Sequence, residues 1–144
     1  MPGDSVYVDT SVLGAYYCPE PLSEAAETAL LAVPEPCIST LSEVEFTSLI
    51  ARKRRLRELT DRQSTEVLRL FDQHVTDGRY RRLPLGTEHF FRARALIGTK
   101  AIALTTLDGL HLSVALSAGI PLLTADRDFA RAARRHGATA TLVK

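Results

Sequence analysis

The sequence predicts an α/β domain with a mostly parallel central sheet and helices on both of its faces. Short runs of β-branched and aromatic residues alternate with longer helix-forming stretches along the chain, which is typical of parallel strands joined by helices. The 144 residues are 45% hydrophobic and 24% charged, as in an ordinary soluble protein, so we expect a single domain over residues 1–144. No apolar run approaches the ~18 residues that span a bilayer, and the first residues lack the pattern of a secretion signal. The expectation is a cytoplasmic protein with no membrane contact.

Two strand–helix units are expected in the first part of the chain. The β-branched and aromatic run 6–8 stops at three consecutive capping residues, 9–11, which predicts a strand followed by a helix. Helix-forming residues over 23–33 predict a second helix, closed by two prolines. The run 37–39 then predicts a short strand that enters a helix over 41–56.

The same alternation continues to the end of the chain. Apolar spacing predicts a helix from residue 60 or 61 to about 75, before an Asp-Gly pair, and Gly119 is a natural stop for the helix before it. The elements expected in this part are helices over 60–75, 87–97, 105–118 and 126–136, and strands over 80–83, 120–124 and 139–143.

Charge and cysteine content exclude two classes of protein. Residues 1–51 contain eight acidic residues and no Lys or Arg, whereas the rest of the chain contains all 18 basic and nine acidic residues. This polarity indicates an acidic site that faces a basic surround or partner, and it excludes a globally basic nucleic-acid binder. Cys18 and Cys37 have neither zinc-site spacing nor a disulfide framework, so we expect two reduced, packed thiols.

Four carboxylates fall where the predicted fold brings chain segments together. Asp9 and Asp126 each follow a predicted strand, and ligands of such sheets bind outside the carboxyl ends of the strands. Glu45 lies just over one turn into the helix after the second strand, on its inner side. Asp108 opens the helix that precedes the strand leading to Asp126. We therefore expect the four carboxylates to converge.

Each carboxylate also has a simpler interpretation. Asp9 and Asp126 are good caps for the helices that follow them. Asp108 fits a capping box with Thr105. A helical glutamate such as Glu45 most often faces solvent.

Taken together, the carboxylates favour a metal site. Clustered carboxylates raise one another's pKa unless a cation neutralises them, and oxygen-only ligands without His or Cys select Mg²⁺ or Mn²⁺ rather than zinc. Such ions commonly serve phosphate chemistry, in which they activate water and stabilise the leaving oxygen. Four neighbouring polar residues are candidates for supporting hydrogen bonds: Thr10, Ser11, Thr124 and Asp128.

Four segments of the chain resemble a known family. Residues 8–13, 39–46, 107–115 and 123–129 are similar to the four acidic motifs of PIN-domain nucleases. Their order, their spacing and the chain length most resemble the VapC-type toxins of bacterial and archaeal toxin–antitoxin pairs. The resemblance runs from about residue 7 to residue 143.

The resemblance implies a set of site residues. Glu45 is preferred over Glu43 because the family's glutamate lies six residues after the strand-end serine, here Ser39. Gly109 stands where many relatives have alanine, a departure that loosens the helix start by roughly 0.5–1 kcal/mol. The acids implied as catalytic and metal-binding are Asp9, Glu45, Asp108 and Asp126.

His111 and the arginine-rich segments have lesser roles in this interpretation. His111 has apolar neighbours in its helix, so we expect a packed, hydrogen-bonded histidine rather than a general base. Basic residues at the end of the Glu45 helix and along the last helix suit a polyanionic backbone, although a solvated basic face explains them equally well. The RNA-binding candidates are Arg52, Lys53, Arg127 and Arg131.

The resemblance also implies a fold, an activity and partners. It implies a three-layer PIN-like fold and a metal-dependent endoribonuclease that blocks translation by cutting a structured cellular RNA. It further implies a homodimer and an antitoxin, for which the apolar faces of helices 23–33 and 60–75 are candidate surfaces. The alternative is a PIN-like RNA-binding or interaction module without catalysis, which need not bind Mn²⁺.

Overall fold

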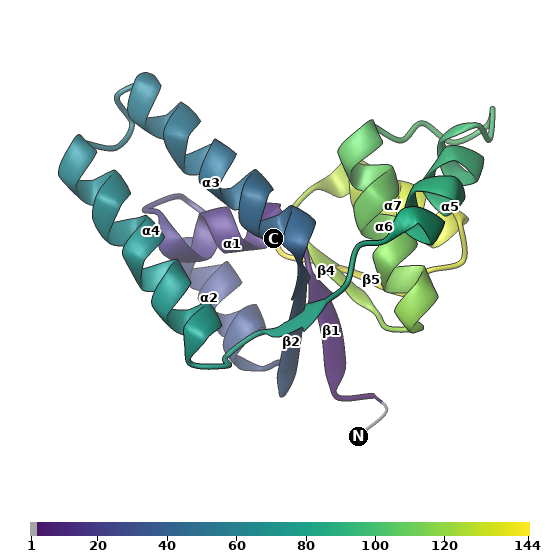
Figure 1. Cartoon of the computed structure of the whole chain (residues 1–144), viewed down its shortest axis with the longest axis horizontal. Coiled ribbons are helices and arrows are strands. Elements are labelled where there is room, and N and C mark those ends of the chain that lie inside the picture. Colours follow the sequence, from purple (N-terminus) through teal and green to yellow (C-terminus); the bar gives the residue numbers. More distant parts are fainter. Residues whose placement is uncertain (1–2) are drawn as a thin grey trace.

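A computed structural model describes residues 3–144 and contains a five-stranded parallel sheet between two layers of helices (Figure 1). The strand order is β3-β2-β1-β4-β5, and each strand runs parallel to its neighbours. The predicted α/β class with helices on both faces is confirmed.

The described elements follow the predicted order. The strands are β1 (Ser5–Val8), β2 (Glu35–Ser39), β3 (Arg81–Leu83), β4 (Leu122–Thr124) and β5 (Ala140–Leu142). The helices are α1 (Thr10–Tyr17), α2 (Ser23–Leu31), α3 (Thr40–Arg55), α4 (Asp61–Thr76), α5 (Thr87–Ile97), α6 (Thr106–Ala118) and α7 (Arg127–Arg135).

The alternation of side chains along β1 divides the core into two parts. Val8 belongs to the cluster beneath α1–α4, together with Phe46 and Phe71. Tyr7 points to the other side and belongs to the cluster that includes Leu112 and Phe129 of α6 and α7. Figure 1 shows the same division, with α1–α4 on one side of the sheet and α5–α7 on the other. Each face of the sheet is therefore buried by its own helical layer.

Two local signals in the sequence correspond to real helix ends. Ser39 is the N-cap of α3, and its backbone N–H donates to Ser42 Oγ at 3.0 Å. Gly119 ends α6 in the left-handed conformation (φ 67°), which glycine adopts without steric cost. The first cap matters most for the site, because α3 starts at the sheet edge and carries Glu45.

The expectation of two packed thiols is met. Cys18 and Cys37 are free and buried. No helix among the described residues combines the length and the apolar character needed to cross a membrane.

Candidate metal centre

The carboxyl ends of the parallel strands bring the predicted motifs to one edge of the sheet. Asp9 follows β1 directly, and its backbone N–H donates to Leu123 O of the neighbouring β4 at 2.9 Å. Thr124 ends β4, and Ser39 ends β2. The strand ends therefore place residues from three separate motifs side by side.

Asp9 is buried, with 5% of its surface exposed, and is held by two hydroxyl groups. Ser11 Oγ and Thr124 Oγ1 both donate to Asp9 Oδ2, at 2.6 and 2.8 Å. Burial raises the pKa of Asp9, and the two hydrogen bonds oppose this change only in part. Asp9 does not cap α1 with its side chain. Its local structure therefore favours the site interpretation over simple capping.

The two hydroxyl groups are themselves fixed by the backbone after β4. Ser11 Oγ accepts the N–H of Ala125 at 2.9 Å, and Thr124 Oγ1 accepts the N–H of Asp126 at 3.0 Å. Thr10 differs from both, because its hydroxyl oxygen is buried and has no well-formed hydrogen bond among residues 3–144. It interacts instead with the carboxylate of Glu45 and helps to lower the pKa of that group.

Glu45 lies next to Asp9 through the fold of α3. One ligand atom from each of Asp9, Glu45 and His111 lies within 4.8 Å of the others. Burial raises the pKa of Glu45, but contact with His111 outweighs it, so the pKa is lowered overall. Glu45 is therefore held as a carboxylate at the edge of the buried region.

Glu43 is directed elsewhere. Its two carboxylate oxygens accept hydrogen bonds from Arg82 Nε and Nη2 at 2.7 and 2.8 Å. Such a fork-shaped pair fixes both oxygens of the carboxylate. Of the two candidate glutamates, Glu45 is the one that faces Asp9.

His111 is a fully buried, hydrogen-bonded histidine, as expected from its apolar helix. Its Nε2 lies 3.3 Å from Glu45 Oε2, and its Nδ1 lies 2.5 Å from the hydroxyl of Tyr7. Tyr7 also contacts Ser39 Oγ at 2.8 Å and Ser42 Oγ at 3.3 Å. Burial raises the pKa of Tyr7 far above its ordinary range, so the hydroxyl stays protonated.

Sequence reasoning missed Tyr7 and Ser42 as parts of this site. A tyrosine in a short apolar strand is typical of core, and nothing local indicates that its hydroxyl meets a histidine 104 residues away. The one available signal was the serine pair at 39 and 42, which supplies two buried hydroxyl groups at a helix start.

Asp108 and Asp126 form the more open part of the cluster. Burial, together with the charges of Asp9 and Asp126, raises the pKa of Asp108 to about 6. Its backbone N–H donates to Thr105 Oγ1 at 3.2 Å, as the predicted cap requires. Asp126 is exposed, and its Oδ1 caps α7 by accepting the N–H of Phe129 at 3.0 Å. Asp126 therefore acts as a cap while its charge also reaches Asp108.

A hollow of about 640 Å³ opens beside these two acids. Asp108, Asp126 and Asp128 line it together with the segment 97–105 between α5 and α6. Asp9 and Glu45 thus lie together in the buried part of the site, whereas Asp108 and Asp126 line the open part. The supporting candidate Asp128 is exposed in the open part.

The four RNA-binding candidates differ in availability. Arg52, Arg127 and Arg131 are exposed. Lys53 instead forms ion pairs with Glu20 at 3.0 Å and Glu58 at 3.4 Å, and its side chain is only 15% exposed. Its position makes Lys53 a structural link between α3 and the segment after α1.

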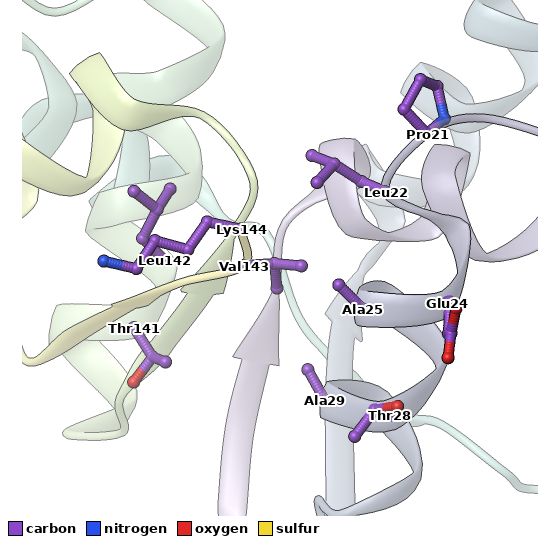
Figure 2. Close-up of a pocket in the computed structure, with 10 residues that line it drawn as sticks. All are labelled: Pro21, Leu22, Glu24, Ala25, Thr28, Ala29, Thr141, Leu142, Val143 and Lys144. Atoms are coloured by element: carbon purple, nitrogen blue, oxygen red, sulfur yellow. The ribbon is translucent and has the colours of Figure 1, made fainter.

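A second hollow, of about 620 Å³, lies between α2 and the C-terminal residues (Figure 2). Leu22, Ala25 and Ala29 approach it from the helical side, and Leu142 and Val143 from the other. Glu24 and Lys144 are the titratable side chains among its lining residues, so it lacks the clustered carboxylates of the first hollow.

The comparison with protein families decides what this fold and cluster belong to. A family model of the PIN domain matches residues 6–135. The chain belongs to the PIN-domain family. No curated protein matches this PIN domain at a significant level by sequence.

Solved structures similar to this PIN domain extend over nearly its whole length. FitAcB from Neisseria gonorrhoeae is 17% identical, with a TM-score of 0.72, 94% of this chain covered and 95% of the other. VapC20 from Mycobacterium tuberculosis, a sarcin–ricin loop cleaving toxin, is 18% identical, with a TM-score of 0.70 and coverages of 88% and 94%. VapBC2 from Rickettsia felis, bound to a DNA fragment from its promoter, is 14% identical, with a TM-score of 0.72 and coverages of 97% and 99%. At these identities the similarity establishes the shared fold.

Proposed function

We propose that this PIN domain is a divalent-metal-dependent endoribonuclease and acts as the toxin of a toxin–antitoxin pair. The observation that carries the proposal is the acidic cluster at the carboxyl ends of β1 and β4. Asp9 and Glu45 meet there, and Asp108 is close enough to Asp9 and Asp126 for their charges to raise its pKa. A cluster of this kind is unfavourable without a cation.

The donor set fits Mg²⁺ or Mn²⁺. The four proposed ligands are carboxylates, whose hard oxygens favour these ions over zinc. The nitrogen of His111 beside Asp9 and Glu45 is a departure from the cluster without histidine that the sequence led us to expect. Asp9, Glu45, Asp108 and Asp126 would hold the cation. When bound, such an ion supplies charge neutralisation and an activated water for hydrolysis of a phosphodiester.

The surrounding side chains have separate roles in this proposal. Ser11 and Thr124 fix one oxygen of Asp9, and the Thr10 hydroxyl helps to keep Glu45 ionised. Asp128 supports the open side of the site. The exposed cations Arg52, Arg127 and Arg131 attract the phosphates of RNA, whereas Lys53 takes part mainly through its ion pairs.

A structured cellular RNA is the proposed substrate, with a block of translation as the result. VapC20, which shares the fold, is named for cleaving the sarcin–ricin loop. This chain has nine aromatic residues of the stacking type and no tryptophan, so recognition through the shape and backbone of the RNA is favoured over base stacking.

An antitoxin and a second copy of the chain are the proposed partners. The similarity to VapBC2 supports a cognate protein partner. A hollow of about 340 Å³ beside α2 is lined by Leu30 and Leu31 of this helix and by His74 of α4. Leu31 is 68% exposed, so this surface offers apolar area to an amphipathic segment.

The proposal is tested by incubating the purified chain, freed of any bound antitoxin, with total cellular RNA in Mg²⁺ or Mn²⁺. We expect discrete cleavage that EDTA abolishes. Asp9→Asn and Glu45→Gln should each lower the cleavage rate by at least about 100-fold, because each removes one charge of the cation site.

Glu43→Gln is the matched control for Glu45→Gln. It makes the same chemical change two residues away on α3, at a side chain that pairs with Arg82. Cleavage should survive in this variant. If the wild type neither cleaves RNA nor binds Mn²⁺, the noncatalytic RNA-binding or interaction module becomes the better interpretation.

A further inference from the structure

A chain of buried hydrogen bonds reaches Glu45 from inside the protein. His111 contacts Glu45 Oε2 through Nε2 at 3.3 Å and the Tyr7 hydroxyl through Nδ1 at 2.5 Å. Tyr7 and His111 are completely buried. The three residues come from β1, α6 and α3, and the contact between His111 and Glu45 joins a helix of one layer to a helix of the other.

The chemistry of the partners sets the direction of these hydrogen bonds. A carboxylate only accepts, so His111 Nε2 must carry the hydrogen in its contact with Glu45. In a neutral imidazole Nδ1 is then the acceptor, and Tyr7 donates to it. The Tyr7 oxygen can in turn accept from the hydroxyl groups of Ser39 and Ser42, at 2.8 and 3.3 Å. Every buried group in the series then has a partner, which is the arrangement that rigidifies a polar network.

We propose that His111, held by Tyr7, is a positioning residue that orients Glu45 through Nε2–H and is not itself a ligand of the cation. This inference rests on the proposed function, because it takes Glu45 as a cation ligand. The opposite arrangement places the hydrogen on Nδ1 and makes Nε2 a third ligand atom beside Asp9 and Glu45. The 3.3 Å contact with Glu45 favours the Nε2–H form in the metal-free protein, because a carboxylate can only accept a hydrogen bond.

The position of the hydrogen is measured directly by ¹⁵N NMR of the histidine rings in the metal-free protein. Spectra are recorded over a range of pH, so that the signals of the singly protonated ring report which nitrogen carries the hydrogen. The His111 signals are assigned by their loss in His111→Gln. We expect the Nε2–H form in the wild type and a loss of this preference in Tyr7→Phe. An Nδ1–H tautomer in the wild type would overturn the inference, whatever the activity of the protein.

Calorimetric titration with Mn²⁺ alone tests the effect on Glu45. His111→Leu should weaken Mn²⁺ binding about 10–100-fold, as the loss of a residue that orients a ligand does, and His111→Gln should stay within about threefold of wild type because its amide N–H replaces Nε2–H. Equal losses in the two variants would overturn the positioning role. Absence of Mn²⁺ binding by the wild type would instead overturn the proposed function, and the inference with it.

The chain contains a matched control for Tyr7→Phe. Tyr17 OH contacts His74 Nδ1 at 2.6 Å between α1 and α4, so Tyr17→Phe removes a similar tyrosine–histidine bond away from the carboxylates. Both variants should lower the melting temperature, but only Tyr7→Phe should weaken Mn²⁺ binding. Unchanged Mn²⁺ affinity in a folded Tyr7→Phe variant would count against the inference.

Discussion

At the scale of single residues, Asp9 shows how the site is prepared for a cation. Ser11 and Thr124 both donate to Oδ2, which leaves Oδ1 without either donor. Burial nevertheless raises the pKa of Asp9, because two hydroxyl groups replace water incompletely. The metal-free site therefore has an electrostatic cost, and the same feature makes a cation favourable there.

Asp108→Asn should make the metal-free protein more stable at neutral pH. The raised pKa of Asp108, about 6, means that folding disfavours its charged form. One pKa unit corresponds to about 1.4 kcal/mol, and solvent screening of this partly exposed group reduces the gain to about 1 kcal/mol. The backbone N–H that Thr105 accepts remains in the variant. Thermal unfolding in EDTA measures the change.

The stabilisation expected for Asp108→Asn should be present at neutral pH and lost in acid. Above about pH 6 the wild-type carboxylate is charged in the folded state, so the full gain should be seen. As the pH falls from about 6 to below about 4, Asp108 becomes protonated first in the folded and then in the unfolded state, and the gain should vanish. Asp128→Asn, at an exposed neighbour, should give no such gain. A lower melting temperature for Asp108→Asn at pH 7.5 would contradict the prediction.

How far single residues could be predicted depends on the range of their contacts. Asp9 and Asp126 were predictable because parallel strands bring their carboxyl ends to one edge, and this follows from local patterns alone. The packed state of His111 was predicted and is confirmed. Its contact with Glu45 spans 66 residues and joins helices from opposite layers, which no local pattern reveals. The same holds for the hydroxyl of Tyr7.

At the scale of elements, the packing of α5 against α6 explains Gly109. The sequence indicated only that a glycine would loosen the start of the helix. In the structure a Cβ at this position would lie 2.7 Å from Cγ1 and Cδ1 of Ile97, so the two helices approach too closely for a side chain. Asp108 precedes this contact, and the glycine therefore helps to place a site residue.

Gly109→Ala should destabilise the protein although alanine favours helices. Relief of the clash requires Ile97 or α5 to move, and overpacking typically costs about 1–3 kcal/mol, more than the ~1 kcal/mol that alanine gains over glycine in a helix. In an Ile97→Ala background the clash is absent, so the same substitution should become stabilising. Chemical denaturation of the wild type, the two single variants and the double variant measures the change in unfolding free energy in each background. Stabilisation by Gly109→Ala in the wild-type background would refute the steric explanation.

Element positions were predicted more fully than element ends. The order of strands and helices follows from periodicity and from helix stops such as Gly119. The start of β2 was not predicted, because Glu35 and Pro36 have no strand pattern of their own. They are extended because they pair with Ser5 and Val6 of β1, a contact between distant segments.

At the scale of the whole molecule, the fold pairs some acids of the acidic first part of the chain with cations of its basic remainder. Within the part of the chain that the structure describes, acids from the first 51 residues pair with cations from the remainder, as in Lys53–Glu20, Arg81–Glu35 and Arg82–Glu43. These cations are occupied within the protein. The exposed arginines of α3 and α7 are then the stronger candidates for contact with a polyanion, a distinction that the sequence alone did not make.

The salt dependence of RNA binding tests the exposed arginines of α3 and α7. Each arginine that neutralises an RNA phosphate releases counterions, so its loss should reduce the slope of log affinity against log salt by about one. We expect this reduction for Arg52→Ala and Arg131→Ala, measured with a synthetic RNA stem–loop on an Asp9→Asn background in EDTA, where no cleavage interferes. Arg62→Ala is the control, because Arg62 is exposed on α4 but pairs with Glu66 at 3.3 Å. Identical slopes in all three variants would place the RNA on another face, and the basic ends of α3 and α7 would then be explained by solvation alone.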